Sequence, residues 1–328
     1  MNNVERSAWK SPNEMTCGIC GNTTAQILTD RLRKGTGTVI YCKSCDHGSL
    51  IPDEKIDTKE YYSKKYRKEY SHRASGSTTN AREIYDTYNK YQGHRVELIS
   101  QYLFPTAKVL EVGASAGQFL SNIKSQVAQV DAIELDESCC EFMRNEFNIR
   151  ADSEFIRTSK FCDEKYDVVC AFQVMEHVES PVDFLLDLRL SMKKNSWAFV
   201  EVPNLHDPLL SVWNVNSYKT FYYHSAHLHY FSETSLKKAA INAGFLPGQI
   251  SIKFTQDYNL LNHLNWIMNG APQATCDVGL SEINVRGANE EISNWLTEKL
   301  KSLNSEYIAK LITTKVTSNL MMVLSSGQ

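Results

Sequence analysis

The chain has 328 residues, of which 42% are hydrophobic and 22% are charged, and it carries a formal net charge of -3. These values are typical of globular proteins, and they exclude the strong basic excess that non-specific binding of nucleic acid requires. The length is sufficient for one full α/β domain and a smaller module.

Targeting signals are not recognisable in the sequence. No run of about 18 apolar residues predicts a transmembrane helix, and the first ten residues, MNNVERSAWK, lack the apolar core of a signal peptide. Four of the nine cysteines form two C-x-x-C pairs, and the others are scattered. This distribution favours a reducing cytoplasm and one metal site over a disulfide framework.

The two cysteine pairs lie near the N-terminus, as Cys17-x-x-Cys20 and Cys42-x-x-Cys45, with the strand-like segment 38–41 between them. Four thiolates from two such turns can surround one tetrahedral ion, and Zn²⁺ is the favoured metal. A closed shell of four sulfur ligands leaves no open position, so we predict a structural zinc ribbon over residues 1–55. A redox pair is the weaker alternative, because two copies occur at ribbon spacing.

Residues 56–104 are predicted to form a helical linker or lid. Tyr62, Tyr66 and Tyr70 recur every four residues, on one face of a helix. We expect this stripe to pack against the main domain, although part of it could roof a site, since tyrosine has an apolar body and a polar tip. The polar, Gly/Ser-rich segment 71–80 indicates a loop.

The next segment, 81–103, predicts one helix that leads into the core. On this helix we expect His94 and Arg95 to be solvated; a reach into a ligand pocket is the alternative.

From residue 108 onward, predicted strands and helices alternate. Strands are expected at 109–113, 130–134, 167–171 and 197–202, and helices at 117–125, 137–147, 180–193 and 233–243. Regular alternation predicts an α/β fold, a mostly parallel sheet with helices on both faces, and it places ligands beyond the carboxyl ends of the strands. We assign this core to residues 105–250. Residues 251–328 are expected to supply a helical insertion, at 255–318, and an antiparallel last strand at 320–324.

The segment 108–120, KVLEVGASAGQFL, is predicted to be a strand, a glycine-rich turn and the start of a helix. Gly113 and Gly117 permit a sharp turn and the close approach of a ligand, and the helix start directs free N–H groups toward it. The spacing differs from the G-x-G-x-x-G dinucleotide fingerprint. About 20 residues on, Glu134 ends the next apolar stretch, where a carboxylate can hold two ribose hydroxyls. An ordinary strand–turn–helix is the alternative interpretation.

This pairing resembles motif I and the following acidic residue of class I S-adenosylmethionine (SAM) methyltransferases, with Ser115 in place of the middle glycine. The segment 166–184, YDVVCAFQVMEHVESPVDF, resembles the "hVLEHv-x-x-P" segment of the same group. The resemblance implies a Rossmann-like class I methyltransferase sheet that binds SAM. The residues implied to bind the cofactor are Glu111, Gly113, Ala114, Ser115, Gly117, Glu134, Leu135 and Gln173.

Two histidines are candidates for the catalytic base. In the family, the histidine matching His177 faces the junction of cofactor and substrate. The segment 218–232, YKTFYYHSAHLHYFS, resembles the "YHEHlsYfS" stretch of zinc-containing sugar C-methyltransferases, whose catalytic Glu-His pair falls on Ala226 and His227. The missing carboxylate favours O- or N-methylation, because proton removal from carbon demands more of a base. His227, or else His177, would accept the proton.

Alternative roles remain for residues near these histidines. The three histidines of segment 218–232 could bind a metal, but no Asp or Glu joins them in the sequence. Glu176 is expected to be a buried polar group that holds its loop.

Several polar residues are implied to bind the methyl acceptor. The segment 201–204 resembles the family's "EvPN" turn on the substrate side, and segment 254–273 is rich in aromatic and amide groups, which suit a sugar. A packed helix with solvated polar residues explains the second segment equally well. The residues assigned to the acceptor are Asn204, His224, His229, Tyr230, Gln256, Tyr258, Asn262 and His263.

Together these resemblances imply SAM-dependent methyl transfer to a sugar, a nucleotide sugar or a related small polar acceptor in surface-polysaccharide biosynthesis. We expect SAM and structural Zn²⁺ as cofactors, a small-molecule partner and no nucleic acid; a homodimer is left open. One alternative is an RNA base methyltransferase, against which the acidic charge balance counts. The other is a non-catalytic binding module, against which the intact Glu134 and Gly117 count.

Overall fold

A seven-stranded sheet forms the centre of the chain, in the computed structural model that describes residues 16–23, 26–53, 58–66, 69, 72–73, 76–77 and 80–327. Its spatial order is β12-β13-β10-β9-β6-β7-β8. In chain order its strands are β6 (Lys108–Val112), β7 (Gln129–Ile133), β8 (Arg150–Asp152), β9 (Tyr166–Phe172), β10 (Met192–Pro203), β12 (Ile250–Thr255) and β13 (Asn319–Ser325). β13 pairs antiparallel with both β10 and β12, and the other pairs are parallel, so six strands run in one direction and β13 runs in the other. The predicted α/β fold with an antiparallel last strand is confirmed.

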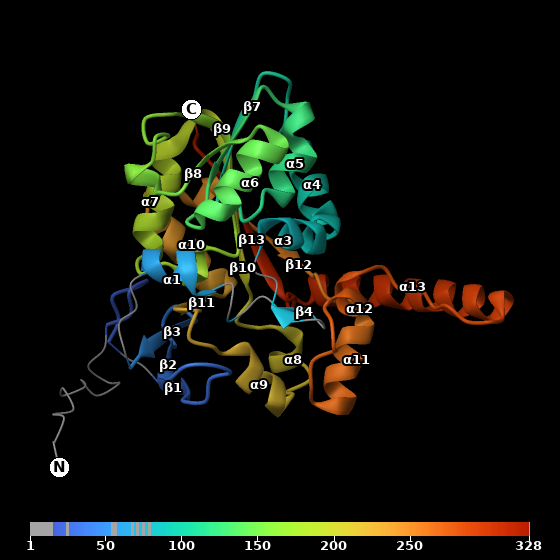
Figure 1. Cartoon of the computed structure of the whole chain (residues 1–328). Helices are drawn as coiled ribbons and strands as arrows, with labels where there is room; N and C mark the ends of the chain where they lie inside the picture. Colours follow the sequence, from blue (N-terminus) through green and yellow to red (C-terminus); the bar gives the residue numbers. More distant parts are fainter. Residues whose placement is uncertain are drawn as a thin grey trace, which may run out of the picture.

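Helices cover both faces of this sheet (Figure 1). Successive side chains of a strand point to opposite faces, so Val109 packs with α4, α5 and α6, whereas Leu110 packs with α7 and α10. Because both faces are buried, the central strands are almost continuously apolar. The helices concerned are α3 (Ala81–Tyr88), α4 (Gly93–Ser100), α5 (Gln118–Ile123), α6 (Glu137–Phe147), α7 (Pro181–Ser191) and α10 (Glu233–Asn242).

The segment 81–103 differs from the single helix that was predicted. Helix α3 ends at Tyr88, one 3-10 turn follows over Asn89–Tyr91, and α4 starts at Gly93. This break redirects the chain, so that side chains on both sides of it reach the carboxyl ends of the strands. Other short 3-10 turns lie at Lys124–Gln126, Ile156–Thr158, Met175–His177 (η5) and Pro247–Gln249.

A second sheet contains the cysteine-rich N-terminal segment. Its antiparallel strands are β1 (Gln26–Thr29), β2 (Gly37–Cys42) and β3 (His47–Pro52), and a fourth strand, β11 (His229–Tyr230), extends it. In that extension His229 pairs with Ser49, and Tyr230 pairs with Gly48. The N-terminal sheet therefore takes one of its strands from a segment about 180 residues further along the chain. Between the two sheets in sequence lie α1 (Thr58–Lys64) and the pair β4 (His72–Arg73) and β5 (Gly76–Ser77).

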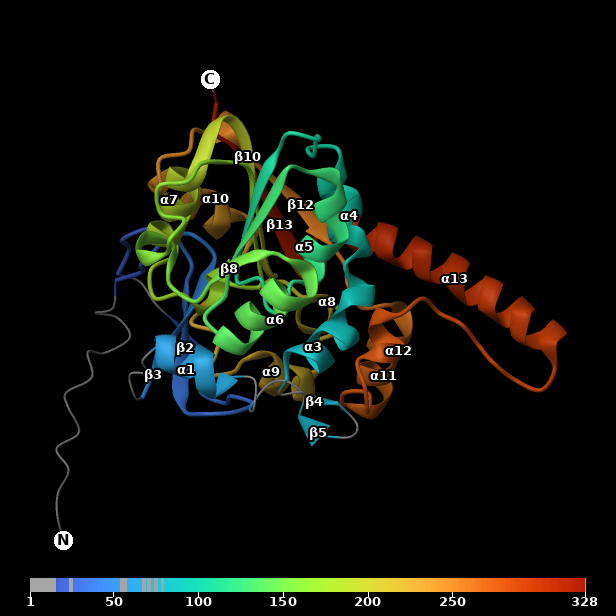
Figure 2. The same cartoon turned by 45° about the horizontal axis from the view of Figure 1, so that its top comes forward.

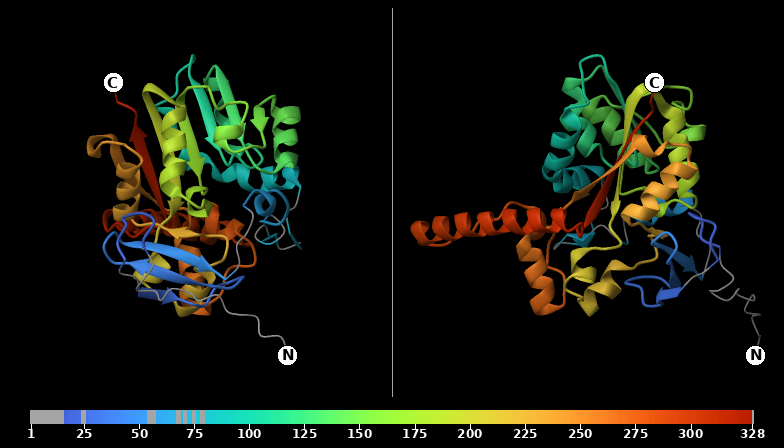
Figure 3. Two further views of the ribbon diagram at one scale, coloured as in Figure 1. Left: turned by 90° about the vertical axis from the view of Figure 1, so that its left-hand side faces the viewer. Right: turned by 180° about the vertical axis from the view of Figure 1, so that it is seen from behind.

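The predicted insertion between the last two strands is helical. It contains α11 (Leu260–Asn269), α12 (Asp277–Leu280) and α13 (Glu290–Thr313). Helix α13 projects from the body of the molecule (Figure 2 and the right-hand view of Figure 3), and Leu311 is its one buried residue. The short helices α8 (Pro208–Ser211) and α9 (Asn216–Tyr222) follow β10. No helix of the described ranges is long and apolar enough to cross a membrane.

Candidate active site

A first cavity, of about 370 Å³, lies at the carboxyl ends of β6, β7 and β9. Gly113 and Gly117 turn the chain there with φ of 75° and 81°, and Ser115 between them has φ of 51°. Gln173, at the end of β9, has φ of 57°. Positive φ is costly for residues other than glycine, and such strain clusters at ligand sites. Of the eight residues predicted to bind SAM, seven line this cavity: Glu111, Gly113, Ala114, Ser115, Glu134, Leu135 and Gln173.

The predicted cofactor residue outside the lining is Gly117. It is required by packing, because a Cβ there would lie 2.8 Å from the Met143 side chain. Gly113 is packed even more tightly: a Cβ on it would lie 2.3 Å from Cγ2 of Val174. Both glycines therefore fix the shape of the turn through the protein's own packing.

Three carboxyl groups line the first cavity, those of Glu111, Glu134 and Asp187. The buried Glu111 has one oxygen, Oε2, without a hydrogen-bond partner among the described residues. Burial raises the pKa of Glu111 well above its usual value; Arg95 opposes this rise, and Glu134 adds to it. Glu134 accepts hydrogen bonds from the backbone N–H groups of Ser115 (2.7 Å) and Asp136 (3.1 Å). An unpaired buried acceptor is costly, and an ammonium group of a ligand would supply the missing donor.

The tyrosine stripe, predicted to pack against the main domain, lines this cavity. Tyr62 and Tyr66 line it, and their rings lie 5.3 Å and 5.6 Å from the ring of His177. The hydroxyl of Tyr62 also donates to the carbonyl of Ala226, at 3.2 Å. Tyr70 and half of the predicted loop 71–80 lie outside the described residues. The described part of the stripe thus covers the cavity beside a candidate base.

A second cavity, of about 710 Å³, adjoins the first. Four residues line both of them: Tyr88, Gln92, Arg95 and Gln173. Three of these four flank or follow the break between α3 and α4. Of the residues predicted to bind the acceptor, three line the second cavity: His224, Gln256 and Tyr258.

The other predicted acceptor residues line neither cavity. Asn204 donates to the carbonyl of Thr317 at 2.9 Å, and Nδ1 of His263 lies 2.7 Å from the hydroxyl of Tyr307. His229 forms a 3.1 Å hydrogen bond with His47. Tyr230 and Asn262 are likewise buried. All five side chains are buried, and four of them, those of Asn204, His229, Tyr230 and His263, form hydrogen bonds within the protein.

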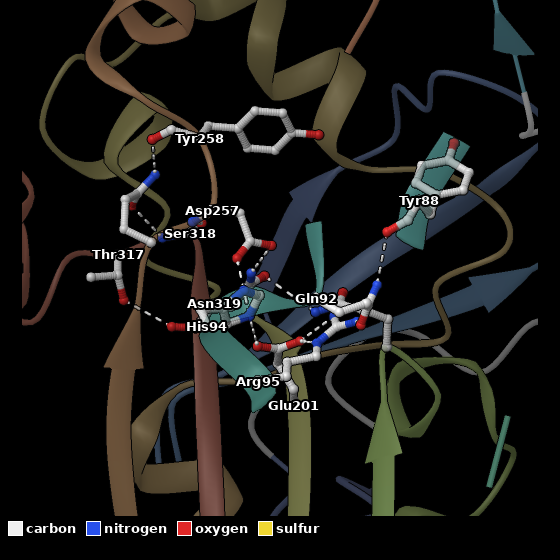
Figure 4. Close-up of polar contacts among 12 residues, drawn as sticks. Tyr88, Gln92, His94, Arg95, Glu201, Asp257, Tyr258, Thr317, Ser318 and Asn319 are labelled. Carbon is white, nitrogen blue, oxygen red and sulfur yellow. Dashed lines mark hydrogen bonds and ion pairs between the residues drawn. The ribbon is translucent and has the colours of Figure 1, made fainter. Parts of the chain in front are cut away.

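Arg95 lies in the wall between the two cavities and forms a buried ion pair with Glu201 (Figure 4). Nε of Arg95 donates to Glu201 Oε2 at 2.8 Å, and Nη2 of Arg95 contacts the same oxygen. Burial alone would raise the pKa of Glu201, but Arg95 and His94 outweigh it and lower the pKa to about 2. The expectation of a solvated Arg95 is wrong, because β10 supplies a buried carboxylate to it. His94 is 38% exposed and lies 3.3 Å from Glu201 Oε1.

Asp257 is a residue of the second cavity that the sequence reasoning missed. Its Oδ2 accepts a 2.6 Å hydrogen bond from Asn319, and its Oδ1 lies 3.6 Å from Nε2 of His94 (Figure 4). Burial, followed by the nearby Glu201, raises its pKa. The available signal was its position, directly after a strand of the sheet and between the predicted residues Gln256 and Tyr258.

The candidate bases, His177 and His227, lie on either side of the cavity boundary. His177 lines the first cavity and His227 the second, and their ring centroids are 4.8 Å apart. Burial lowers the pKa of His177 to about 4 and that of His227 well below its usual value. Both imidazoles are therefore neutral near pH 7 and carry a lone pair that can accept a proton.

The four N-terminal cysteines converge on one point. Their Sγ atoms lie within 4.8 Å of one another, with 3.6 Å between Cys17 and Cys45 and 3.5 Å between Cys20 and Cys42. Tetrahedral Zn–S bonds of about 2.3 Å place sulfur atoms about 3.8 Å apart, so the set fits such an ion closely. These cysteines can hold zinc.

Comparison with known proteins agrees with this geometry. The family model described as "Methyltransferase domain" matches residues 83–247. Phosphoethanolamine N-methyltransferase 2 of Haemonchus contortus, solved with phosphomonomethylethanolamine and S-adenosylhomocysteine, is 10% identical with a TM-score of 0.50, covering 91% of this chain and 71% of that one. A SAM-dependent methyltransferase of Archaeoglobus fulgidus is 17% identical with a TM-score of 0.47, covering 74% and 96%.

A search of curated proteins gives no match to this sequence. The family model, however, spans half of the chain and contains β6, β7 and β9, the strands whose ends form the first cavity. The chain therefore belongs to the methyltransferase-domain family and has the fold of a SAM-dependent methyltransferase.

Proposed function

We propose that this chain transfers the methyl group of SAM to a hydroxyl or amine of a sugar, a nucleotide sugar or a related small polar acceptor. The observation that carries the proposal is the pair of adjoining cavities with four residues in common. One cavity has the strained glycine turn and carboxylates that suit SAM, and the other has room for an acceptor. When bound, SAM supplies an activated methyl group, so the protein mainly has to align the acceptor and exclude water.

The residues of the first cavity fit SAM by their chemistry. Glu134 can accept hydrogen bonds from ribose hydroxyls with its remaining lone pairs, since each carboxylate oxygen offers two. The unpartnered Oε2 of Glu111 can accept from the ammonium of the methionine part. Tyr62 and Tyr66 cover the cavity and keep water from it.

The second cavity suits a sugar-type acceptor. Aromatic rings can stack on the apolar face of a sugar, and carboxylates and amides can bind its hydroxyls. Two cations, Arg33 and Lys90, can bind phosphate groups of a nucleotide sugar. The similarity of segment 218–232 to sugar C-methyltransferases supports an acceptor of surface-polysaccharide biosynthesis. The aromatic residues that line this cavity are Tyr88, Tyr91, Tyr218, Phe221, Tyr222 and Tyr258.

Proton removal from the acceptor falls to His227 or His177. Both are neutral near pH 7, and they flank the boundary between the cavities. The general base need only take a proton from oxygen or nitrogen, which asks less than removal from carbon.

The proposal is tested by two measurements on the whole chain. Calorimetric titration with SAM should show binding, and a screen of nucleotide sugars with isotopically labelled SAM should identify a product that gains the labelled methyl group. His227→Ala should abolish transfer while SAM affinity is kept. Loss of SAM affinity together with turnover would instead make His227 a cofactor-binding or folding residue, and an absence of SAM binding by the wild type would refute the proposal.

A further inference from the structure

The structure brings a carboxylate to one of the histidines of segment 218–232, although none adjoins them in the sequence. Glu176, on η5, directs Oε1 to within 3.7 Å of Nε2 of His177 and 3.9 Å of Nε2 of His227. Their ligand atoms all lie within 4.8 Å of one another. A backbone hydrogen bond of 2.8 Å, from Leu228 N–H to the Glu176 carbonyl, ties the two segments together.

A hydrogen bond made by His177 determines which of its ring nitrogens faces Glu176. Nδ1 of His177 lies 2.7 Å from the carbonyl oxygen of Ala226. Since a carbonyl only accepts, Nδ1 carries the proton and Nε2 of the neutral ring presents a lone pair toward Glu176. Metal-binding histidines are usually oriented in this way, with the second ring nitrogen donating to a backbone carbonyl.

The cluster is deeply buried and incompletely satisfied. The side chain of Glu176 is 1% exposed, and its Oε2 has no hydrogen-bond partner within the described part of the chain. Nδ1 of His227 also lacks one there, and the His227 side chain is 14% exposed. Two acceptor atoms that face each other in a buried place repel unless a cation or a shared proton lies between them.

We propose that Glu176, His177 and His227 form a binding site for a divalent transition-metal ion, separate from the four-cysteine cluster. Two imidazoles and one carboxylate are the ligand set of catalytic zinc sites and of related iron sites. Ligands about 2.1 Å from a tetrahedral ion lie about 3.4 Å apart, so closing the 3.7 Å and 3.9 Å gaps requires movements of only a few tenths of an ångström.

A second group of possible ligands, His94, Glu201 and Asp257, is a weaker candidate. There the buried guanidinium of Arg95 already neutralises Glu201, and a second cation beside it would be repelled. No cationic side chain is hydrogen-bonded to Glu176 among the described residues. Charge balance therefore favours the Glu176 cluster.

Three protein ligands leave at least one position of the ion open. Because His177 lines the first cavity and His227 the second, that position would face their boundary. With the ion bound, Nε2 of both histidines would serve as a metal ligand and not as the proton acceptor described above. A water molecule or an oxygen atom of an acceptor could bind at the open position. This last step rests on the proposed function, whereas binding of the ion does not.

The test is a titration of chelator-treated, full-length protein with Co²⁺ alone, followed by absorption spectroscopy. Cobalt bound by thiolates shows intense sulfur-to-metal charge-transfer bands, whereas cobalt bound by imidazole and carboxylate shows only weak visible bands. We expect two equivalents in the wild type, one of each spectral type. Glu176→Gln and His227→Asn should each lose the site without charge transfer, and Cys17→Ser should lose the other.

His263→Asn is the matched control, because His263 is buried but lies outside the cluster; it should keep both equivalents. Glutamine has nearly the same shape as glutamate, so Glu176→Gln should fold normally. If this variant keeps the thiolate spectrum, its cysteine module is folded, and the loss of the other cobalt equivalent is not caused by misfolding of that module. A wild type that binds cobalt only with the thiolate spectrum would overturn the proposal and leave a proton shared between Glu176 and the histidines. Neither result depends on methyl transfer.

Discussion

The two cavities are built in different ways. The first is formed by the ends of three adjacent parallel strands, and most of its lining comes from the short segments 111–119, 133–135 and 172–178. The second is assembled from distant parts of the chain, from Arg33 in the N-terminal module to Asn319 at the start of the last strand. Sheet topology determines most of the first, whereas the second depends on how the insertions and the N-terminal module pack.

The largest effect on stability is expected from substitution of Arg95, in the wall between the two cavities. Arg95→Met would leave the fully buried Glu201 without its partner, and breaking a buried ion pair costs about 3–5 kcal/mol of unfolding free energy. Urea unfolding followed by circular dichroism measures this loss. Arg157→Met is the control, since Arg157 is 59% exposed and its pair with Asp187 is screened by solvent, so that its loss should change the unfolding free energy far less.

A double variant separates the missing charge from the missing packing. Arg95→Met combined with Glu201→Gln removes both charges and should recover a large part of the lost stability. If the single variant were no less stable than Arg157→Met, the pair would not stabilise the wall between the cavities.

The turn of the first cavity gives the next largest effect. Gly113→Ala places a Cβ 2.3 Å from the Val174 side chain at a φ of 75°, and we expect a stability loss of about 3 kcal/mol with at least tenfold weaker SAM binding. Differential scanning fluorimetry and calorimetry measure the two quantities. Gly248→Ala, where no atom lies within 4 Å, should change neither. Equal behaviour of the two variants would show that the turn does not shape the cofactor site.

The second cavity contains a buried carboxyl group whose ionisation should be visible in the stability of the protein. Asp207 accepts a 2.8 Å hydrogen bond from the backbone of Leu209, and burial raises its pKa to about 7. Because the folded pKa exceeds the unfolded value of about 4, folding favours the protonated form, and stability falls as the pH rises from about 4 through 7.

Comparison with Asp207→Asn isolates this contribution. Between pH 5 and pH 7 the wild type should lose about 2 kcal/mol more than the variant in urea-unfolding free energy. Parallel curves for the two proteins would mean that water reaches Asp207 and that the second cavity is more open than its geometry indicates.

The smallest effect expected concerns recognition of the acceptor. Asp257→Asn keeps the shape of the side chain but removes a carboxylate that lines the second cavity and not the first. We expect KM for the acceptor to rise about tenfold, about 1.4 kcal/mol, with unchanged affinity for SAM. Steady-state kinetics with the acceptor found in the screen measure this, and a matching loss of SAM affinity would remove the distinction between the cavities.

The two cavities also differ in how much of their lining could be predicted from the sequence. The lining of the first cavity could be predicted, because its residues are contiguous and the ends of neighbouring parallel strands must meet. Arg95 could not be placed, since its partner Glu201 lies 106 residues away on a strand whose neighbours are not readable from the pattern. The break before α4, which directs Arg95 inward, leaves only a weak local signal at Gly93.

The surroundings of the histidines in segment 218–232 could not be predicted from the sequence either. His227 and His229 are two residues apart, and extended backbone directs such residues to one side only when the strand is regular. Here His229 enters β11 and meets His47, whereas His227 lies before the strand and reaches the second cavity. Only the pairing of β11 with a strand of the N-terminal module separates their surroundings, and that pairing links segments about 180 residues apart.

Because β11 pairs with β3, the state of the four cysteines bears on the position of residues outside the N-terminal module. Stripping or oxidising the cysteines would loosen β3, and with it the two backbone pairs that hold residues 229 and 230. The imidazole of His227, two residues before His229, would then lose its fixed orientation. A molecule with damaged thiols would thus be impaired in the proposed methyl transfer even though every residue that lines the first cavity was intact.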